Sequence, residues 1–122
     1  MFSVGIDMIE IPRIEKSMKK RRFLRFILGG EEYLQLEKRG FPAKSVAANF
    51  CAKEAFLKSM GLGLFKLDFK NIEVLRNSSG KPYISLSGDA LEFAQKNNFN
   101  FSVSITHTKQ CASAVVLCFK QA

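Results

Sequence analysis

The sequence predicts an α+β protein in which an antiparallel sheet packs against helices. Helical spacing of apolar residues dominates the first half of the chain, and strand-like alternation dominates the second half. The 122 residues fit a single domain over 1–122. A hydrophobic fraction of 47% with 12 Phe is typical of a packed core and excludes a disordered chain.

The N-terminal third is predicted to form a strand followed by two helices. The apolar run 2–6 has the length of a short strand. A helix is expected over 12–28, because Pro12 suits a first helical turn. Gly29-Gly30 then breaks the helix, and a second, short helix follows over 31–39.

The most regular helical pattern covers residues 46–60. Ser45 is a suitable N-cap, and Gly61 is a suitable C-cap. One face carries larger apolar residues and a second carries small ones, so this helix is expected to pack on two sides. The first face comprises Val46, Phe50, Leu57 and Met60, and the second comprises Ala48, Ala52, Ala55 and Ser59.

The second half of the chain is predicted to be rich in strands. Strands over 72–75 and 83–86 flank Asn77-Ser78-Ser79-Gly80, a sequence typical of a hairpin loop. One short helix separates this hairpin from the last two strands. Apolar and hydroxyl side chains alternate over 101–106, and 112–119 is apolar enough to form a central strand.

The net charge of +8 predicts an anionic partner, such as nucleic acid, an acidic membrane surface, a phosphorylated ligand or an acidic protein. No apolar run approaches the roughly 18 residues of a membrane span. The N-terminus lacks the pattern of a signal peptide. Three cysteines without a CxxC pair favour a reducing cytoplasm over a disulfide framework or zinc site.

Much of the positive charge lies between residues 13 and 25, where one acid, Glu15, faces seven basic side chains. These are Arg13, Lys16, Lys19, Lys20, Arg21, Arg22 and Arg25. Such a run is often only a solvated face, but the imbalance favours docking of an acidic partner. A small nucleic-acid-binding protein is the main alternative on charge alone. No aromatic RNA-binding motif supports it.

Two acids carry the strongest chemical signal. Asp7 directly follows the first predicted strand, and Glu54 lies on the mostly apolar helix 46–60. Asp7 has an ordinary reading as a turn or helix-cap acid. Glu54 can be interpreted equally simply as the partner of Lys58 or Lys53 in an ion pair. If the two carboxylates converge, they form an open oxygen site of the kind that Mg²⁺ binds together with substrate phosphates.

The single histidine of the chain, His107, follows a predicted strand. A lone histidine is often structural, although a strand end is also a common place for a ligand contact. Ser104, Thr106 and Thr108 surround it with hydroxyls suited to phosphate. Gly80-Lys81-Pro82 has two readings as well, a plain turn or a second contact of this kind.

Four motifs in this order resemble the phosphopantetheinyl transferases, and within them the short, single-domain holo-[acyl-carrier-protein] synthase family. The resemblance spans nearly the whole chain. The motifs are Gly5-Ile6-Asp7 with Glu10-Ile11 and Arg13-Ile14; Phe50-Cys51-Ala52-Lys53-Glu54-Ala55-Phe56 with Lys58 and Gly61; Gly80-Lys81-Pro82; and Ser104-Ile105-Thr106-His107-Thr108.

The resemblance implies transfer of 4′-phosphopantetheine from coenzyme A to a serine of apo-acyl carrier protein, with release of adenosine 3′,5′-bisphosphate. By similarity, Asp7 and Glu54 hold Mg²⁺, and Lys58 contacts the same phosphates. Either Glu54, or Asp7 acting through a metal-bound water, would take the serine proton. A carrier-binding module without catalysis is the third reading.

The resemblance also implies where the substrates bind. Contacts with the nucleotide end of coenzyme A fall to Lys44, Lys81, Pro82, His107 and Thr108. Docking of the acidic carrier protein falls to Arg13, Arg21, Arg22, Phe23 and Arg25, without nucleic acid or membrane as partner. A homotrimer with sites between subunits is implied, and the small-residue face of 46–60 is compatible with close packing.

Two positions depart from the family pattern. Asn49 stands where many relatives carry arginine, so a phosphate contact is either missing or supplied from elsewhere. Gly29-Gly30 replaces a more usual hydroxyl cap, which is expected to loosen the start of the second helix.

Overall fold

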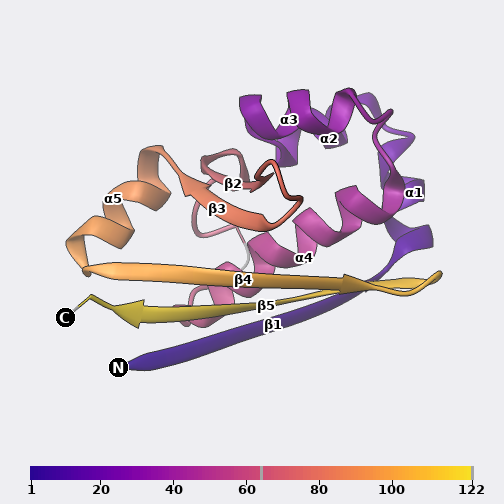
Figure 1. Ribbon diagram of the computed structural model, residues 1–122. Coiled ribbons are helices and arrows are strands. Elements are labelled where there is room, and N and C mark those ends of the chain that lie inside the picture. The colour runs from indigo at the N-terminus through magenta and orange to yellow at the C-terminus, as the bar shows by residue number, and fades with distance from the viewer. Residues whose placement is uncertain (64, 122) are drawn as a thin grey trace.

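The computed structural model describes residues 1–63 and 65–121, which form two antiparallel sheets, five α-helices and one 3-10 helix (Figure 1). This architecture confirms the predicted α+β class. The elements in chain order are β1 (Phe2–Glu10), α1 (Ile11–Met18), α2 (Arg21–Ile27), α3 (Gly30–Glu37), α4 (Ala43–Ser59), η1 (Phe69–Asn71), β2 (Ile72–Arg76), β3 (Pro82–Leu86), α5 (Gly88–Lys96), β4 (Phe99–His107) and β5 (Cys111–Lys120).

The larger sheet has the strand order β1-β5-β4, so the last strand is central, as predicted. The register places Asp7 opposite Ala114, and Ala114 opposite Ile105. Because β5 offers pairing partners as far as Glu10, β1 is four residues longer than the sequence predicts. The prediction that Asp7 follows the strand is therefore wrong, and Asp7 lies inside it.

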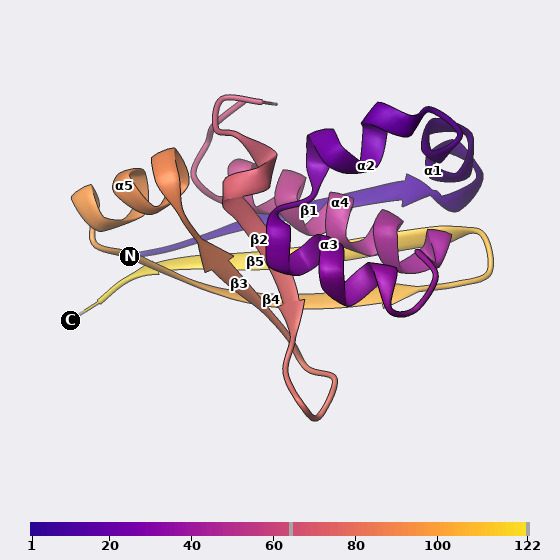
Figure 2. The same ribbon diagram turned by 90° about the horizontal axis from the view of Figure 1, so that it is seen from above.

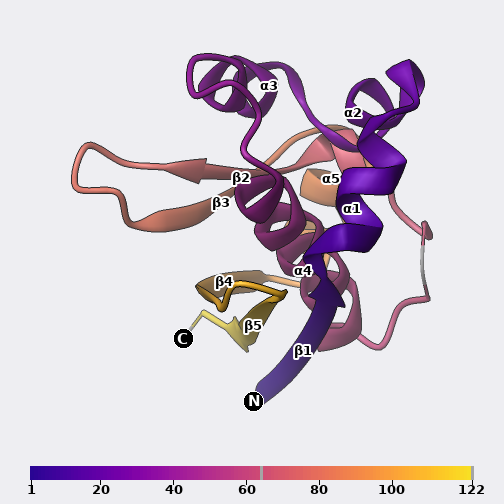
Figure 3. The ribbon, with the colours of Figure 1, turned by 90° about the vertical axis from the view of Figure 1, so that its right-hand side faces the viewer.

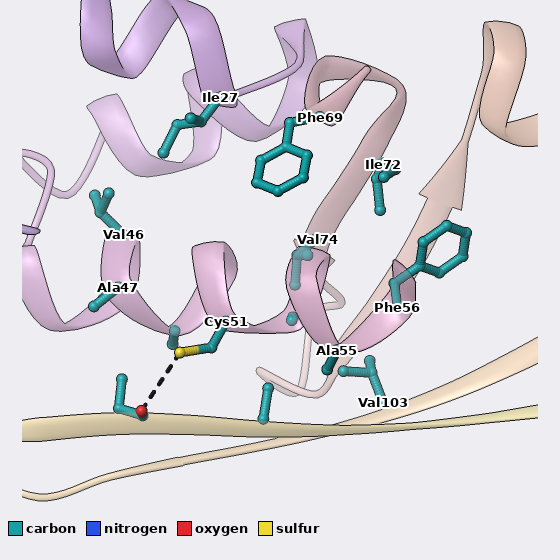
Figure 4. Packing of buried hydrophobic residues seen from close by; sticks show 14 of the residues in the cluster. Ile27, Val46, Ala47, Cys51, Ala55, Phe56, Phe69, Ile72, Val74 and Val103 are labelled. Carbon is teal, nitrogen blue, oxygen red and sulfur yellow. Dashed lines mark hydrogen bonds between the residues drawn. The ribbon is translucent and has the colours of Figure 1, made fainter. Parts of the chain in front are cut away.

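Helix α4 lies across this sheet and forms the centre of the molecule (Figure 4). Its small-residue face packs on β1 and β5, where a Cβ atom on Gly5 would overlap the carbonyl oxygen of Ala55. Its other side contacts Phe69 and Val74, below the smaller sheet. The small-residue face is thus buried within the chain and is not available for packing between subunits.

The ends of α4 agree in part with the sequence. Pro42 is the N-cap, and Ser45 lies inside the first turn, so the prediction of Ser45 as the N-cap is wrong. At the other end Gly61 has a φ of 72°, which is the left-handed conformation of a helix C-terminus. The Leu62 N–H then donates to the Leu57 carbonyl oxygen at 2.9 Å.

The helix predicted over 12–28 is broken into α1 and α2 at Lys19 and Lys20. Lys20 has extended backbone angles, with φ −87° and ψ 120°. Like charges on neighbouring turns without acidic partners weaken a helix here. The break allows Ile14 of α1 and Ile27 of α2 to be buried in the same core.

The smaller sheet consists of the predicted hairpin β2-β3, whose tip projects from the body of the molecule (Figure 2). Helices cover only one face of the larger sheet (Figures 1 and 3). Its other face, here called the outer sheet face, exposes six apolar side chains: Phe2, Val4, Ile6, Met8, Val115 and Leu117. None of the described helices is long and apolar enough to cross a bilayer.

Candidate functional site

The fold brings Asp7 of β1 and Glu54 of α4 together. The Asp7 side chain is 12% exposed, and Glu54 is half-buried. Desolvation and the neighbouring Asp7 carboxylate raise the pKa of Glu54 to about 7, because a second negative charge disfavours ionisation. The two acids singled out by the sequence are thus neighbours, and they are called the carboxylate pair below.

The lysines beside Glu54 have other partners. Lys58 Nζ donates to Asp7 Oδ1 at 3.1 Å and to the carbonyl oxygen of Ile6 at 3.2 Å. Lys53 Nζ lies 2.6 Å from Glu32 Oε1, and both side chains are fully buried. Within the described part of the chain, neither lysine forms an ion pair with Glu54. The alternative that Glu54 serves only as a helical ion-pair partner is therefore wrong.

The carboxylate pair borders a cleft of about 560 Å³. Arg13 of α1 lies in its wall, and the apolar part of the wall includes Phe23, Phe26, Phe50 and Phe65. We call this the Phe-lined cleft. It combines hard oxygen donors, a positive charge and an apolar surface, which suits a ligand with a phosphate beside an apolar segment.

The predicted docking residues are distributed along α1 and α2. Arg13 and Phe23 line the Phe-lined cleft. Arg21 and Arg22 are exposed on α2 outside its lining. The Arg25 guanidinium lies 5.5 Å from the centroid of the Tyr33 ring, so this side chain leans toward α3.

A second pocket, of about 530 Å³, lies at the N-terminal end of α4. Lys44, His107 and Pro82 line this α4 N-terminal pocket, whereas Lys81 does not. Thr108 lines an adjoining pocket of about 580 Å³, which shares Lys44 and His107. The Thr108 hydroxyl also accepts backbone N–H groups of the turn that joins β4 to β5.

The Phe-lined cleft and the α4 N-terminal pocket share no lining residue. Figure 3 shows α1 and α2 on one side of α4, and β3 and β4 on the other. Residues of β1, α1 and α2 line the cleft together with one face of α4, and residues of β2, β3 and β4 line the pocket together with another. The helix itself enforces this separation, since Ala48 lies roughly 160° around its axis from Phe50 at 100° per residue. One chain therefore presents the two sets of predicted site residues in different directions.

Comparison with known proteins identifies the family. A sequence model described as the 4′-phosphopantetheinyl transferase superfamily matches residues 3–114. The chain belongs to this superfamily. The match includes both members of the carboxylate pair and the whole of α4.

Individual members of the superfamily resemble the chain over nearly its full length. The holo-[acyl-carrier-protein] synthase of Alkaliphilus metalliredigens is 46% identical over 114 residues, which cover 91% of this chain and 93% of the relative. The holo-[acyl-carrier-protein] synthase of Syntrophus aciditrophicus is 40% identical over 117 residues, which cover 93% of this chain and 91% of the relative.

Solved phosphopantetheinyl transferases share the fold. The holo-[acyl-carrier-protein] synthase of Neisseria meningitidis superposes with a TM-score of 0.89 at 28% identity, covering 97% of this chain and 98% of the other. The Helicobacter pylori enzyme, solved in complex with coenzyme A, superposes with a TM-score of 0.81 at 32% identity, covering 95% and 99%.

Two pocket residues of this phosphopantetheinyl transferase are not predicted from the sequence. Arg39 and Arg76 line the α4 N-terminal pocket beside Lys44 and His107. Neither belongs to a motif, and the excess of basic residues was the only available signal. Chain folding brings them together from the turn after α3 and the last residue of β2.

The two departures from the family pattern have structural explanations. Asn49 is 1% exposed and donates to Glu32 Oε2 and the Val74 carbonyl oxygen. Glu73 Oε2 accepts the Glu32 N–H at 2.7 Å, which is the bond that a hydroxyl cap would make, and Glu32 Oε1 accepts the Gly29 N–H at 3.1 Å. The expectation that Gly29-Gly30 loosens this helix is wrong, because the Glu73 carboxylate replaces the hydroxyl.

Proposed function

We propose that the chain is a holo-[acyl-carrier-protein] synthase. It would transfer 4′-phosphopantetheine from coenzyme A to a serine of apo-acyl carrier protein. Its relatives carry this name, and the observation that carries the proposal for this chain is the convergence of Asp7 and Glu54 beside the Phe-lined cleft.

In this proposal the carboxylate pair holds Mg²⁺. The fit rests on two hard oxygen donors in a partly desolvated site, with Lys58 bound to Asp7. No group of three or more metal-ligating side chains occurs among the described residues, so phosphate and water oxygens would complete the coordination. Bound magnesium would offset the charge that develops on the phosphate oxygens.

The proposed reaction is a displacement at phosphorus. The serine oxygen of the carrier protein forms a P–O bond with the phosphorus that carries pantetheine. The P–O bond to the bridging oxygen breaks, and its electron pair leaves with adenosine 3′,5′-bisphosphate. One member of the carboxylate pair takes the serine proton, and Lys58 directs its positive charge at the same phosphates.

The carrier protein would dock on α1 and α2. Arg13 beside the cleft, with Arg21, Arg22 and Arg25 on α2, offers positive charge to an acidic surface. Phe23 in the cleft wall offers an apolar contact at its centre. This arrangement accounts for the net charge of +8 without a nucleic-acid partner.

We further propose that the enzyme is a homotrimer that binds coenzyme A between subunits. The outer sheet face supports this proposal, because Phe2 is 78% exposed and Ile6 is 64% exposed, and apolar patches of this kind mark interfaces. The separation of the two pockets by α4 supports it too. The carboxylate pair of one subunit and the α4 N-terminal pocket of the next would together hold one coenzyme A, its nucleotide end contacted by Lys44, His107 and Pro82.

A transfer assay tests the reaction. Purified chain, coenzyme A, Mg²⁺ and apo-carrier protein are incubated, and the carrier is weighed by mass spectrometry. The expected result is the mass gain of one phosphopantetheine group, lost in Asp7→Ala and in Glu54→Ala. No gain at any magnesium concentration would reject the enzyme, and near-normal turnover of either variant would remove that residue from the site.

Subunit complementation tests the shared site. Asp7→Ala and His107→Glu chains, carrying different tags, are inactive alone in this proposal and are co-expressed. Mixed trimers should recover about one third of wild-type activity, since only one of their three sites receives an intact half from each of two subunits. No recovery in verified mixed assemblies would mean that one chain supplies both halves.

Charge reversal tests the docking surface. Arg21→Glu and Arg25→Glu should weaken carrier-protein binding and leave coenzyme A affinity unchanged, because both side chains lie outside the Phe-lined cleft, whereas Arg13 lies in its wall. Surface plasmon resonance and calorimetry measure the two affinities. A fall in coenzyme A affinity instead would contradict the docking assignment.

A further inference from the structure

The α4 N-terminal pocket holds an unusual set of charges. Arg39, Lys44 and Arg76 all line it, and no acidic residue does so in the described part of the chain. The first turn of α4 also lies in its wall, through Ser45, and has no side-chain cap. A helix N-terminus adds to the attraction for an anion.

Arg76 is held in place from several directions. Its Nη2 donates to Asn49 Oδ1 at 3.0 Å. Gln35 brackets its backbone, accepting the Arg76 N–H at 2.9 Å and donating to the Arg76 carbonyl oxygen at 3.0 Å. A guanidinium fixed in this way loses little conformational freedom when it binds a ligand.

Asn49 is oriented by the core. Its amide nitrogen donates to Glu32 Oε2 at 3.0 Å and to the Val74 carbonyl oxygen at 3.2 Å. The amide oxygen must therefore point the other way, toward Arg76. Buried hydrogen bonds of the core thus determine where the Arg76 guanidinium lies at the pocket.

The two arginines repel each other. Desolvation and the nearby Arg39 charge lower the pKa of the Arg76 guanidinium. No carboxylate lies within 4 Å of either guanidinium among residues 1–63 and 65–121. An anion between them would relieve this repulsion and would accept N–H groups from both.

We infer that Arg39 and Arg76 form a clamp for the 3′-phosphate of coenzyme A, and that Asn49 is the residue that positions it. This inference rests on the proposed function, and it makes the arginine pair a determinant of substrate specificity. The 3′-phosphate is a terminal monoester with three free oxygens, which suits two guanidinium forks. The diphosphate is assigned to the carboxylate pair and Lys58, on the other side of α4.

Two pairs of ligands that differ only in the 3′-phosphate test the inference. Calorimetry compares adenosine 3′,5′-bisphosphate with adenosine 5′-monophosphate, and the transfer assay compares coenzyme A with 3′-dephospho-coenzyme A. Arg76→Gln and Arg39→Gln should each lower affinity for the bisphosphate roughly 10- to 100-fold, the worth of a charge-assisted contact. Binding of the monophosphate should change by less than about twofold. The preference for coenzyme A should shrink through KM, with kcat at saturation preserved.

The controls separate loss of the clamp from loss of the fold. Lys96→Gln removes an exposed charge on α5 and should leave both affinities unchanged. Arg39 is exposed, so Arg39→Gln tests the clamp even if Arg76→Gln unfolds. Asn49→Ala should reproduce the Arg76→Gln loss in weaker form if melting shows that it folds.

Two results would overturn the inference. One is an equal loss of affinity for both nucleotides in the arginine variants, and the other is no loss at all. Both can be read only in a wild-type chain that transfers phosphopantetheine. A wild-type chain that neither binds nucleotide nor transfers the group would instead reject the proposed function.

Discussion

The two lysines that flank Glu54 on α4 have opposite surroundings. Lys53 is fully buried and donates to Glu32, to the Phe69 carbonyl oxygen and to the Ile72 carbonyl oxygen. The Lys58 side chain is 54% exposed and reaches Asp7. One lysine therefore holds the smaller sheet against α4, and the other is free to meet a ligand.

Truncation of each lysine should reveal this difference. Lys53→Met should cost about 3–5 kcal/mol of unfolding free energy, because it leaves the Glu32 carboxylate buried without a counter-charge. Lys58→Met should cost no more than about 1 kcal/mol, since its pair is exposed. Urea unfolding measures both, and the double variant Lys53→Met/Glu32→Gln should regain part of the loss. Equal costs for the two lysines would contradict the assignment.

The raised pKa of Glu54 predicts that the site destabilises the metal-free fold. The folded pKa of about 7 lies above the ordinary value of 4.5, so the folded chain gives up stability as pH rises from 4.5 through 7. In EDTA, Glu54→Gln should therefore raise the melting temperature at pH 8 and leave it unchanged at or below pH 4.5. A lower melting temperature at pH 8 would show that Glu54 stabilises the fold instead.

Different faces of helix α4 contact the larger sheet, the buried ion pair and the Phe-lined cleft. Ala55 packs against the sheet, Lys53 points toward the buried ion pair, and Glu54 points toward the Phe-lined cleft. Successive residues of a helix are 100° apart around its axis. Three residues adjacent in sequence can therefore face three different parts of the molecule. The periodicity predicted the two packed sides of this helix, because apolar spacing is a local property.

The contact between β1 and α4 should tolerate no side chain at Gly5. Gly5→Ala is expected to destabilise the protein by about 1–3 kcal/mol or more, since the added methyl group would overlap the Ala55 carbonyl oxygen. Gly30→Ala is the matched control, because no atom lies within 4 Å of its added Cβ and alanine favours the helix. Thermal melting compares them, and a Gly5→Ala variant as stable as Gly30→Ala would contradict this packing.

For the molecule as a whole, six exposed large apolar side chains of the described residues gather on the outer sheet face. Its members alternate along β1, so one strand directs a row of side chains away from the helices. The sequence predicts a short strand over 2–6, and its small-residue face compatible with close packing lies on α4. Burial of the small-residue face against β1 leaves the outer sheet face as the proposed interface.

Charge on this face should dissociate the trimer. Val4→Glu/Ile6→Glu should reduce the mass in solution to that of one chain, because two carboxylates would be desolvated at the interface. Light scattering after gel filtration measures the mass, and transfer activity should fall with it. Leu34→Glu places the same charge on α3, where the side chain is 51% exposed, and should leave the mass unchanged. A monomeric wild-type chain would refute the assembly.

The sequence by itself determined the fold class, the central position of the last strand, the hairpin and the two acids of the carboxylate pair. These features follow from local periodicity, turn chemistry and short motifs, which neighbouring residues specify. The helix breaks and caps were harder to predict from the sequence. The break at Lys19 and Lys20, for example, depends on the burial of Ile14 and Ile27 in one core.

Only the tertiary structure decided which charges meet. Lys58 pairs with Asp7 across 51 residues and Lys53 with Glu32 across 21. Arg76 donates to Asn49 across 27 residues. Asn49, which departs from the family pattern, therefore supports Arg76 in the α4 N-terminal pocket. Each of these partners was visible in the sequence as a polar side chain. Which of them pair depends on desolvation and on the separation of the two pockets by α4. Both arise only once the chain has packed.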